Sequence, residues 1–225
     1  MQLISDGGSP LLSSNGSFLV FSALEDFFAA PQDRNTGIFV YDTNTGEREL
    51  ITRDADGPSS APTISADGGV VAFSTFATNL VPGDVNADSD ALAYDRATSR
   101  FEPLHNVEPR FEFAGGNRNS VDPAISADGR FVTFESLASD LVPADANDRQ
   151  DIFLFDRSTR QNESITFGAN GSSRNPSISA DGIVIAFESE ATNLSSVDVN
   201  GFSSDIFVYD ADTGSTQFIL SLIHI

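Results

Sequence analysis

The chain has 225 residues, of which 40% are apolar and 19 are Phe, enough material for the packed core of a large all-β domain. Its 33 acidic and 12 basic residues give a formal net charge of -21, and such a surface repels nucleic-acid phosphates and anionic lipids. The absence of cysteine and of any apolar run near the ~18 residues of a membrane span excludes disulfides, thiolate sites and membrane insertion.

The chain then divides into repeated units. Residues 1–8 are expected to be the last strand of a preceding unit, and four copies of one unit follow at 9–60, 61–121, 122–174 and 175–219. Each copy opens with a proline and has a third-strand motif such as DIFVYD, and the second copy is longer because of an insertion before residue 122. The prolines that mark the repeat are Pro10, Pro62, Pro123 and Pro176.

Each unit predicts four strands in chain order. The first leads into a turn, SSNG or SADG, in which the Asn or Asp hydrogen-bonds its own backbone and the Gly takes a positive φ. A second strand such as FVTFES, an acidic loop, the third strand, a tight turn and a fourth strand such as QNESITF follow. No helical periodicity is present, so we predict an all-β fold.

The third strand is apolar on both faces. In DIFVYD, Ile206 and Val208 lie on one side and Phe207 and Tyr209 on the other. Such a strand needs a layer above and below it, which four-stranded units stacked around an axis supply. We therefore predict a β-propeller of about four consecutive antiparallel blades, with one surplus N-terminal strand and an incomplete ring.

The repeat motif also resembles a known family. The pattern PxISxDGxxxAFxS followed by DIFVYDxxTG is similar to the WD40-like (PD40) repeat of TolB-like propellers, and the resemblance covers essentially the whole chain. The acidic loops TNLVPGDVN from Thr78 and SDLVPADAN from Ser139 match the family pattern, and TNLSSVDVN from Thr192 lacks its proline. The resemblance implies a binding or scaffolding module with an unknown protein or glycan partner in a periplasmic, secreted or cell-surface location.

Both ends of the sequence favour a fragment of a longer protein. The strand expected at 1–8 has no other strands of its own unit, and the last copy already has a fourth strand, STQFIL. The final residues 220–225, LSLIHI, stay apolar where the other copies run into polar linkers, and we expect them to be a non-native tail. Adjacent blades or domains of a parent chain are therefore expected partners.

Catalytic chemistry is not expected from this chain. His105 and His224 are the only histidines and GxSxG is absent, which disfavours a Ser/His/Asp site and a histidine-rich zinc site. Carboxylates are plentiful, so a paired-acid glycosidase stays open. We predict no catalytic and no cofactor-binding residues. The alternative is a non-catalytic propeller domain of a larger prolyl-oligopeptidase-like or glycan-active enzyme.

The strongest candidate site is the acidic loop of the second copy. Asp84, Asn86, Asp88 and Asp90 stand at alternate positions and offer the oxygen ligands that calcium prefers. An EF-hand would add Asp95, but Asp95 ends a predicted strand that begins just after Asp90, which places it about 16 Å away at 3.3 Å per residue. Flanking helices are absent as well. Any Ca²⁺ site is therefore restricted to the local cluster from Asp84 to Asp90.

The third and fourth copies contain weaker versions of the same loop. The shared set is an Asp, an Asn two residues later and an Asp just before the third strand. The favoured interpretation is that the first Asp and the Asn form Asx turns and the last Asp accepts hydrogen bonds from loop N–H groups, with Ca²⁺ binding as the alternative. The weaker candidate ligands are Asp145, Asn147, Asp151, Asp198, Asn200 and Asp205.

Overall fold

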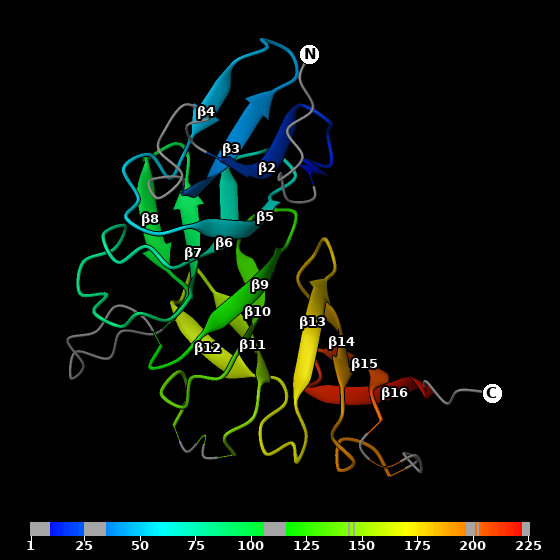
Figure 1. Cartoon of the computed structure of the whole chain (residues 1–225). Helices are drawn as coiled ribbons and strands as arrows, with labels where there is room; N and C mark the ends of the chain where they lie inside the picture. Colours follow the sequence, from blue (N-terminus) through cyan, green and yellow to red (C-terminus); the bar gives the residue numbers. More distant parts are fainter. Residues whose placement is uncertain are drawn as a thin grey trace.

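The structure is a computed structural model that describes residues 10–24, 35–105, 116–143, 145, 147–196, 201 and 203–221. Throughout these residues the regular elements are β-strands, arranged in four separate four-stranded antiparallel sheets (Figure 1). The prediction of an all-β chain of four repeated units is confirmed. No helix that is long and apolar enough to cross a membrane occurs in the described part. The strand expected at residues 1–8 lies outside it.

Each sheet consists of four consecutive strands and forms one blade. Blade 1 contains β1 (Leu11–Leu12), β2 (Phe18–Leu24), β3 (Thr36–Asp42) and β4 (Arg48–Leu50). Blade 2 contains β5 (Ser59–Ile64), β6 (Val70–Thr75), β7 (Asp90–Asp95) and β8 (Arg100–Pro103). Blade 3 contains β9 (Ser120–Ile125), β10 (Phe131–Ser136), β11 (Asp151–Asp156) and β12 (Gln161–Ser164). Blade 4 contains β13 (Ser173–Ile178), β14 (Val184–Ser189), β15 (Asp205–Asp210) and β16 (Ser215–Ser221).

The blades follow one another around a common axis. Strand order within every sheet equals chain order, and the first strands contact each other in succession, β1 with β5, β5 with β9 and β9 with β13. Figure 1 shows the four sheets as an arc that does not close into a ring. Face-to-face antiparallel blades with their first strands innermost define a β-propeller.

The SxDG turns fold as the sequence predicts and also connect the blades. In blade 2, the Ser65 hydroxyl donates to Asp67 (2.7 Å), and Asp67 in turn accepts from the Gly69 N–H (2.8 Å). Equivalent bonds recur in the other three blades. Backbone hydrogen bonds then join successive turns, from Ala66 N–H to Ala127 O and from Ala127 N–H to Ala180 O, both 2.9 Å.

The core lies between successive blades rather than within one sheet. One apolar cluster joins blades 1 and 2, a second joins blades 2 and 3, and a third joins blades 3 and 4. Phe134 and Phe153 pair across neighbouring strands with ring centroids 5.7 Å apart, and Phe187 and Phe207 repeat the pair at 5.8 Å. Strands β7 and β11 are buried on both faces, as expected for a third strand, whereas β15, from which the expectation was drawn, is buried on one face and half-buried on the other.

The turn glycines of blades 2, 3 and 4 pack against the preceding blade. A Cβ on Gly182 would stand 2.3 Å from a ring atom of Phe131, and Gly68 and Gly129 meet Phe18 and Val70 in the same way. In blade 4, Val184 stands at the position of Phe18, Val70 and Phe131 and is 40% exposed. Its strand neighbour β15 alternates between buried and half-buried residues, because no described blade covers that face.

The fourth strands of blades 1 and 3 are shorter than the sequence predicts. The dipeptides Ile51–Thr52 and Ile165–Thr166 were expected in strands but lie in turns. The reason is that the Thr52 hydroxyl accepts the Ile38 N–H (3.0 Å), and Thr166 does the same for Ile152, so a side chain replaces the next ladder carbonyl. First strands β5, β9 and β13 begin two residues before the unit boundaries given above, and β16 includes two residues of the tail set apart at 220–225.

Candidate cation-binding loop

The acidic loop of blade 2 runs from the end of β6 to the start of β7. Asp90 is the first residue of β7 and Asp95 the last, so the extended strand separates them as predicted. Asp95 instead accepts hydrogen bonds from the backbone and hydroxyl of Thr98, both 2.9 Å. The exclusion of Asp95 from the candidate site therefore agrees with its position.

The start of the loop is fastened to the linker before the blade, which sequence analysis did not foresee. Asp56 accepts from the Thr78 N–H and hydroxyl, both 2.7 Å, while Asn79 Oδ1 accepts the Asp56 N–H at 3.2 Å. These hydrogen bonds in both directions explain the Thr-Asn pair with which the loop TNLVPGDVN begins. The arrangement recurs in blades 3 and 4 through the pairs Asn117 with Ser139 and Asp140, and Asn170 with Thr192 and Asn193.

Asn86 shapes the loop as the Asx-turn interpretation requires. Its Oδ1 accepts the Asp88 N–H at 2.7 Å, and its Nδ2 donates to the Gly116 carbonyl at 2.9 Å. The side-chain oxygen that a cation would use is therefore engaged in the turn. Asn147 makes the same turn in blade 3 with the Arg149 N–H, at 2.8 Å. For the Asn of both loops, geometry favours a structural role.

Asp84 and Asp90 form the chemically unusual pair of the loop. They are 8% and 3% exposed, and burial raises the pKa of both carboxyls. Repulsion from Asp84 and the hydrogen bond with it raise the pKa of Asp90 further, to about 8. Within the described residues, Asp84 Oδ1 and Asp90 Oδ2 are buried without a hydrogen-bond partner. Two buried carboxyls in contact must either share a proton or hold a cation.

The third blade shows how the same position is satisfied without a cation. Asp151 Oδ1 accepts from the Thr166 hydroxyl at 2.6 Å, and Oδ2 accepts from Asn147 Nδ2 at 2.9 Å. Burial raises the pKa of Asp151 to about 6 and that of Asp145 above its ordinary value. In blade 2, Asn86 Nδ2 donates to the Gly116 carbonyl at 2.9 Å, and a histidine stands at the position of Thr166.

That histidine is His105, which the sequence analysis considered only as a catalytic or zinc-binding candidate. Leu104 N–H bonds to Ala91 O as Ile165 N–H bonds to Ile152 O, which puts His105 in the register position of Thr166. Its side chain is 8% exposed. Comparison of the copies in register identifies it, whereas the sequence motif alone does not.

Only some of the remaining predicted ligands are among the described residues. Asp205 is fully buried at the start of β15, while Asp198 and Asn200 lie outside the described residues. Across the described ranges, no three Asp, Glu, His or Cys side chains are arranged to hold one metal ion. A cation at Asp84 and Asp90 would therefore complete its shell with backbone carbonyls and water, as calcium commonly does.

A second feature is a hollow on the propeller axis. Its volume is about 510 Å³, and its walls come from the first strands of all four blades. Positive-φ residues precede the repeat prolines here, with Ala61 at 48°, Asp122 at 50° and Asn175 at 54°. Asp122 contributes the one charged side chain of the lining, which consists of Pro10, Leu11, Ala61, Pro62, Thr63, Asp122, Pro123, Asn175 and Pro176.

These features define the class of protein as a β-propeller, and solved structures agree. A putative TolB from Agrobacterium tumefaciens is 19% identical with a TM-score of 0.57, and the match covers 95% of this chain and 63% of that one. The β-propeller domain of the Trilobed protease from Pyrococcus furiosus is 12% identical with a TM-score of 0.58, covering 96% and 57%. An oligogalacturonate lyase from Vibrio parahaemolyticus is 13% identical with a TM-score of 0.55, covering 92% and 50%.

The likeness is one of fold. No family model matches the sequence, and no curated protein matches it. The resemblance to TolB-like propellers inferred from the repeat is confirmed at the level of the fold. This chain spans less than two thirds of each of the three similar structures.

Proposed function

We propose that this chain is a non-catalytic propeller module that binds a segment of a protein partner in its axial hollow. The observation that carries the proposal is the hollow itself, because the first strands of four blades converge on it with proline-rich, largely apolar walls. With a net charge of -21 the chain favours a neutral or basic partner. An extracytoplasmic location belongs to the same proposal and rests on the resemblance.

Selection from a displayed random-peptide library tests this function. Enriched peptides should be neutral or basic, bind more weakly at high salt, and lose binding to an Asp122→Arg variant. Glu47→Arg reverses one charge on an exposed turn residue outside the hollow and should leave binding unchanged. If only neutral glycans on an array bind, and Asp122→Arg abolishes that binding, the protein-partner proposal is wrong.

We further propose that calcium binds at Asp84 and Asp90 and stabilises the blade 2 loop. Support comes from two buried carboxylate oxygens without a hydrogen-bond partner, Asp84 Oδ1 and Asp90 Oδ2. Calorimetric titration of the metal-free chain should give heat at or below millimolar calcium, lost in Asp90→Asn. Asp151→Asn, in the fully hydrogen-bonded loop, is the control and should still bind. No heat from the parent chain ends this proposal.

A second candidate is the propeller domain of a larger enzyme. It is favoured by the fold neighbours, which include a protease propeller domain and a lyase. Sequencing the flanking reading frame tests this candidate, since an adjoining catalytic domain would support it. The purified chain should show neither peptidase nor uronate lyase activity, and measurable turnover abolished by Asp122→Asn would overturn the non-catalytic proposal.

A further inference from the structure

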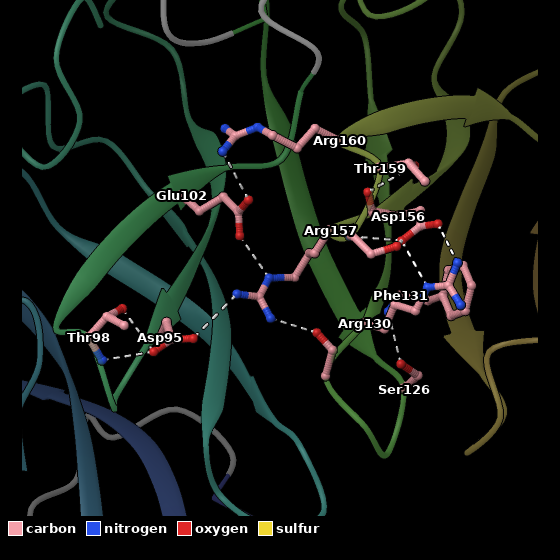
Figure 2. A network of polar contacts seen from close by, with 12 residues as sticks. Asp95, Thr98, Glu102, Ser126, Arg130, Phe131, Asp156, Arg157, Thr159 and Arg160 are labelled. Atoms are coloured by element: carbon pink, nitrogen blue, oxygen red, sulfur yellow. Dashed lines mark hydrogen bonds and ion pairs between the residues drawn. The ribbon is translucent and has the colours of Figure 1, made fainter.

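An arginine closes the junction between blades 2 and 3. Arg157 follows β11, and its guanidinium donates to Glu102 of blade 2 at 2.8 Å and to the Gly129 carbonyl of its own blade at 2.8 Å. Asp95 lies within ion-pair distance at 3.8 Å. Figure 2 shows this guanidinium held between Glu102 and Asp95. A carboxylate from one blade and a turn carbonyl from the next thus form a guanidinium-binding position.

The junction between blades 1 and 2 has the same arrangement. Arg96 donates to Glu49 Oε2 at 3.0 Å and to the Gly68 carbonyl at 2.9 Å. Tyr94 donates to the other oxygen of that glutamate, Oε1, at 3.5 Å. One glutamate therefore accepts a tyrosine hydroxyl and a guanidinium together.

The junction between blades 3 and 4 keeps the acceptors and lacks the arginine. Ala211 is the register equivalent, because its N–H bonds to Ile183 O (2.8 Å) as Arg157 N–H bonds to Arg130 O (3.0 Å). Glu163 occupies the position of Glu102, and Tyr209 donates to its Oε1. No hydrogen bond to Glu163 Oε2 is found in the described part of the chain, and this side chain is exposed where Glu102 is half-buried.

A surface hollow of about 440 Å³ lies where the arginine would be. Its lining contains four acidic residues and one basic residue, Arg130. Because Arg130 is paired with Asp156 at 2.7 Å, three acidic side chains have no basic partner in the lining. Leu154 supplies an apolar wall for a side-chain stem, and the Phe131 ring, also in the lining, has the Arg130 guanidinium over it at 4.5 Å. Asn162 Oδ1, also in the lining, is buried without a hydrogen-bond partner among the described residues. The other acids of the lining are Glu163, Asp181 and Asp212.

We propose that this hollow, defined by Glu163, Gly182 and Ala211, binds the guanidinium group of an arginine from another molecule. The Glu163 carboxylate and the Gly182 carbonyl take the roles that Glu102 and Gly129 have toward Arg157. The planar guanidinium has donors on separate nitrogens, so it reaches a carboxylate and a carbonyl at once, which the compact ammonium of lysine does less well. The site shares no lining residue with the axial hollow and does not depend on it.

The test uses acetyl-arginine methylamide as the probe, with the lysine and citrulline analogues as controls. Titration followed by amide NMR should move the Gly182 resonance saturably with the arginine probe, at least about tenfold more tightly than with neutral citrulline. A short peptide containing one arginine forms a second arm. Tighter binding of the peptide indicates an arginine within a protein, and equal binding indicates free arginine-like ligands.

Three variants make the result decisive. Glu163→Gln should weaken binding about tenfold or more. Ala211→Arg should place a guanidinium in the hollow, raise the melting temperature and prevent binding of the probe. Glu102→Gln changes the equivalent glutamate at a junction that has its own arginine, so it should lower stability while leaving probe binding intact. Equal binding of citrulline, or undiminished binding to Ala211→Arg, overturns the proposal.

Discussion

Substitution of the turn glycines separates the cost of backbone strain from the cost of blade contact. Gly182 has φ of 79°, and an added Cβ would stand 2.3 Å from Phe131 Cδ2 and 2.9 Å from Cγ. Because Cγ is the ring atom attached to the Phe131 Cβ, rotating the ring about the Cβ–Cγ bond cannot relieve the clash, so the whole Phe131 side chain or the turn must shift. Gly16 has a similar φ of 70° with no atom within 4 Å of its Cβ position.

The two substitutions should therefore differ in magnitude. Gly16→Ala carries the left-handed backbone cost alone, about 1–2 kcal/mol. Gly182→Ala adds overpacking of about 1–3 kcal/mol, for a total of about 2–5 kcal/mol. Urea denaturation followed by circular dichroism measures both free energies of unfolding. Equal losses in the two variants would refute the inference that the SxDG glycine is required by contact with the preceding blade.

Three further predictions follow from buried groups. Thr166→Val should cost about 1–3 kcal/mol, because Ile152 N–H and Asp151 lose a buried partner, while Thr166→Ser should retain stability in the same denaturation assay. Burial raises the pKa of Glu135 above its ordinary 4.5, so the folded chain holds the proton more tightly and stability falls as pH rises above about 4.5. Glu135→Gln should flatten that fall in a series of thermal melts, and an unchanged slope would contradict it. Val70→Glu should cost several kcal/mol at its 8% exposed position and Val184→Glu, at 40%, less than about 1 kcal/mol.

Most of the fold was predictable because each local signal is repeated. The SxDG turn needs only Asp67, its serine and a glycine close in sequence, so its geometry could be read directly. The third strands carry apolar residues on both faces, which indicated stacked sheets before any contact was known. The ends of the fourth strands were not predictable, because the Thr52 hydroxyl replaces a ladder carbonyl through a contact between residues 14 apart.

The candidate sites were less predictable, because they depend on residues that differ between the repeats and that contact residues distant in sequence. Alternate acids suggested a ladder of four ligands, but Asn86 turns its oxygen to a backbone N–H and only Asp84 and Asp90 are paired. The position of His105 in place of Thr166 emerges only from strand register. Ala211 carries no chemical signal by itself, and its meaning depends on the arginines at equivalent junctions.

Ala211 stands where blades 2 and 3 have an arginine, and this difference should also affect the order in which the blades unfold. In a stacked array, each blade is stabilised by its own packing and by the junctions with its neighbours. Blade 4 is joined to blade 3 without the two hydrogen bonds that Arg157 makes between Glu102 and Gly129. We expect the amides of β14 and β15 to exchange with solvent through a local opening before those of β6 and β10, making blade 4 a separate cooperative unit.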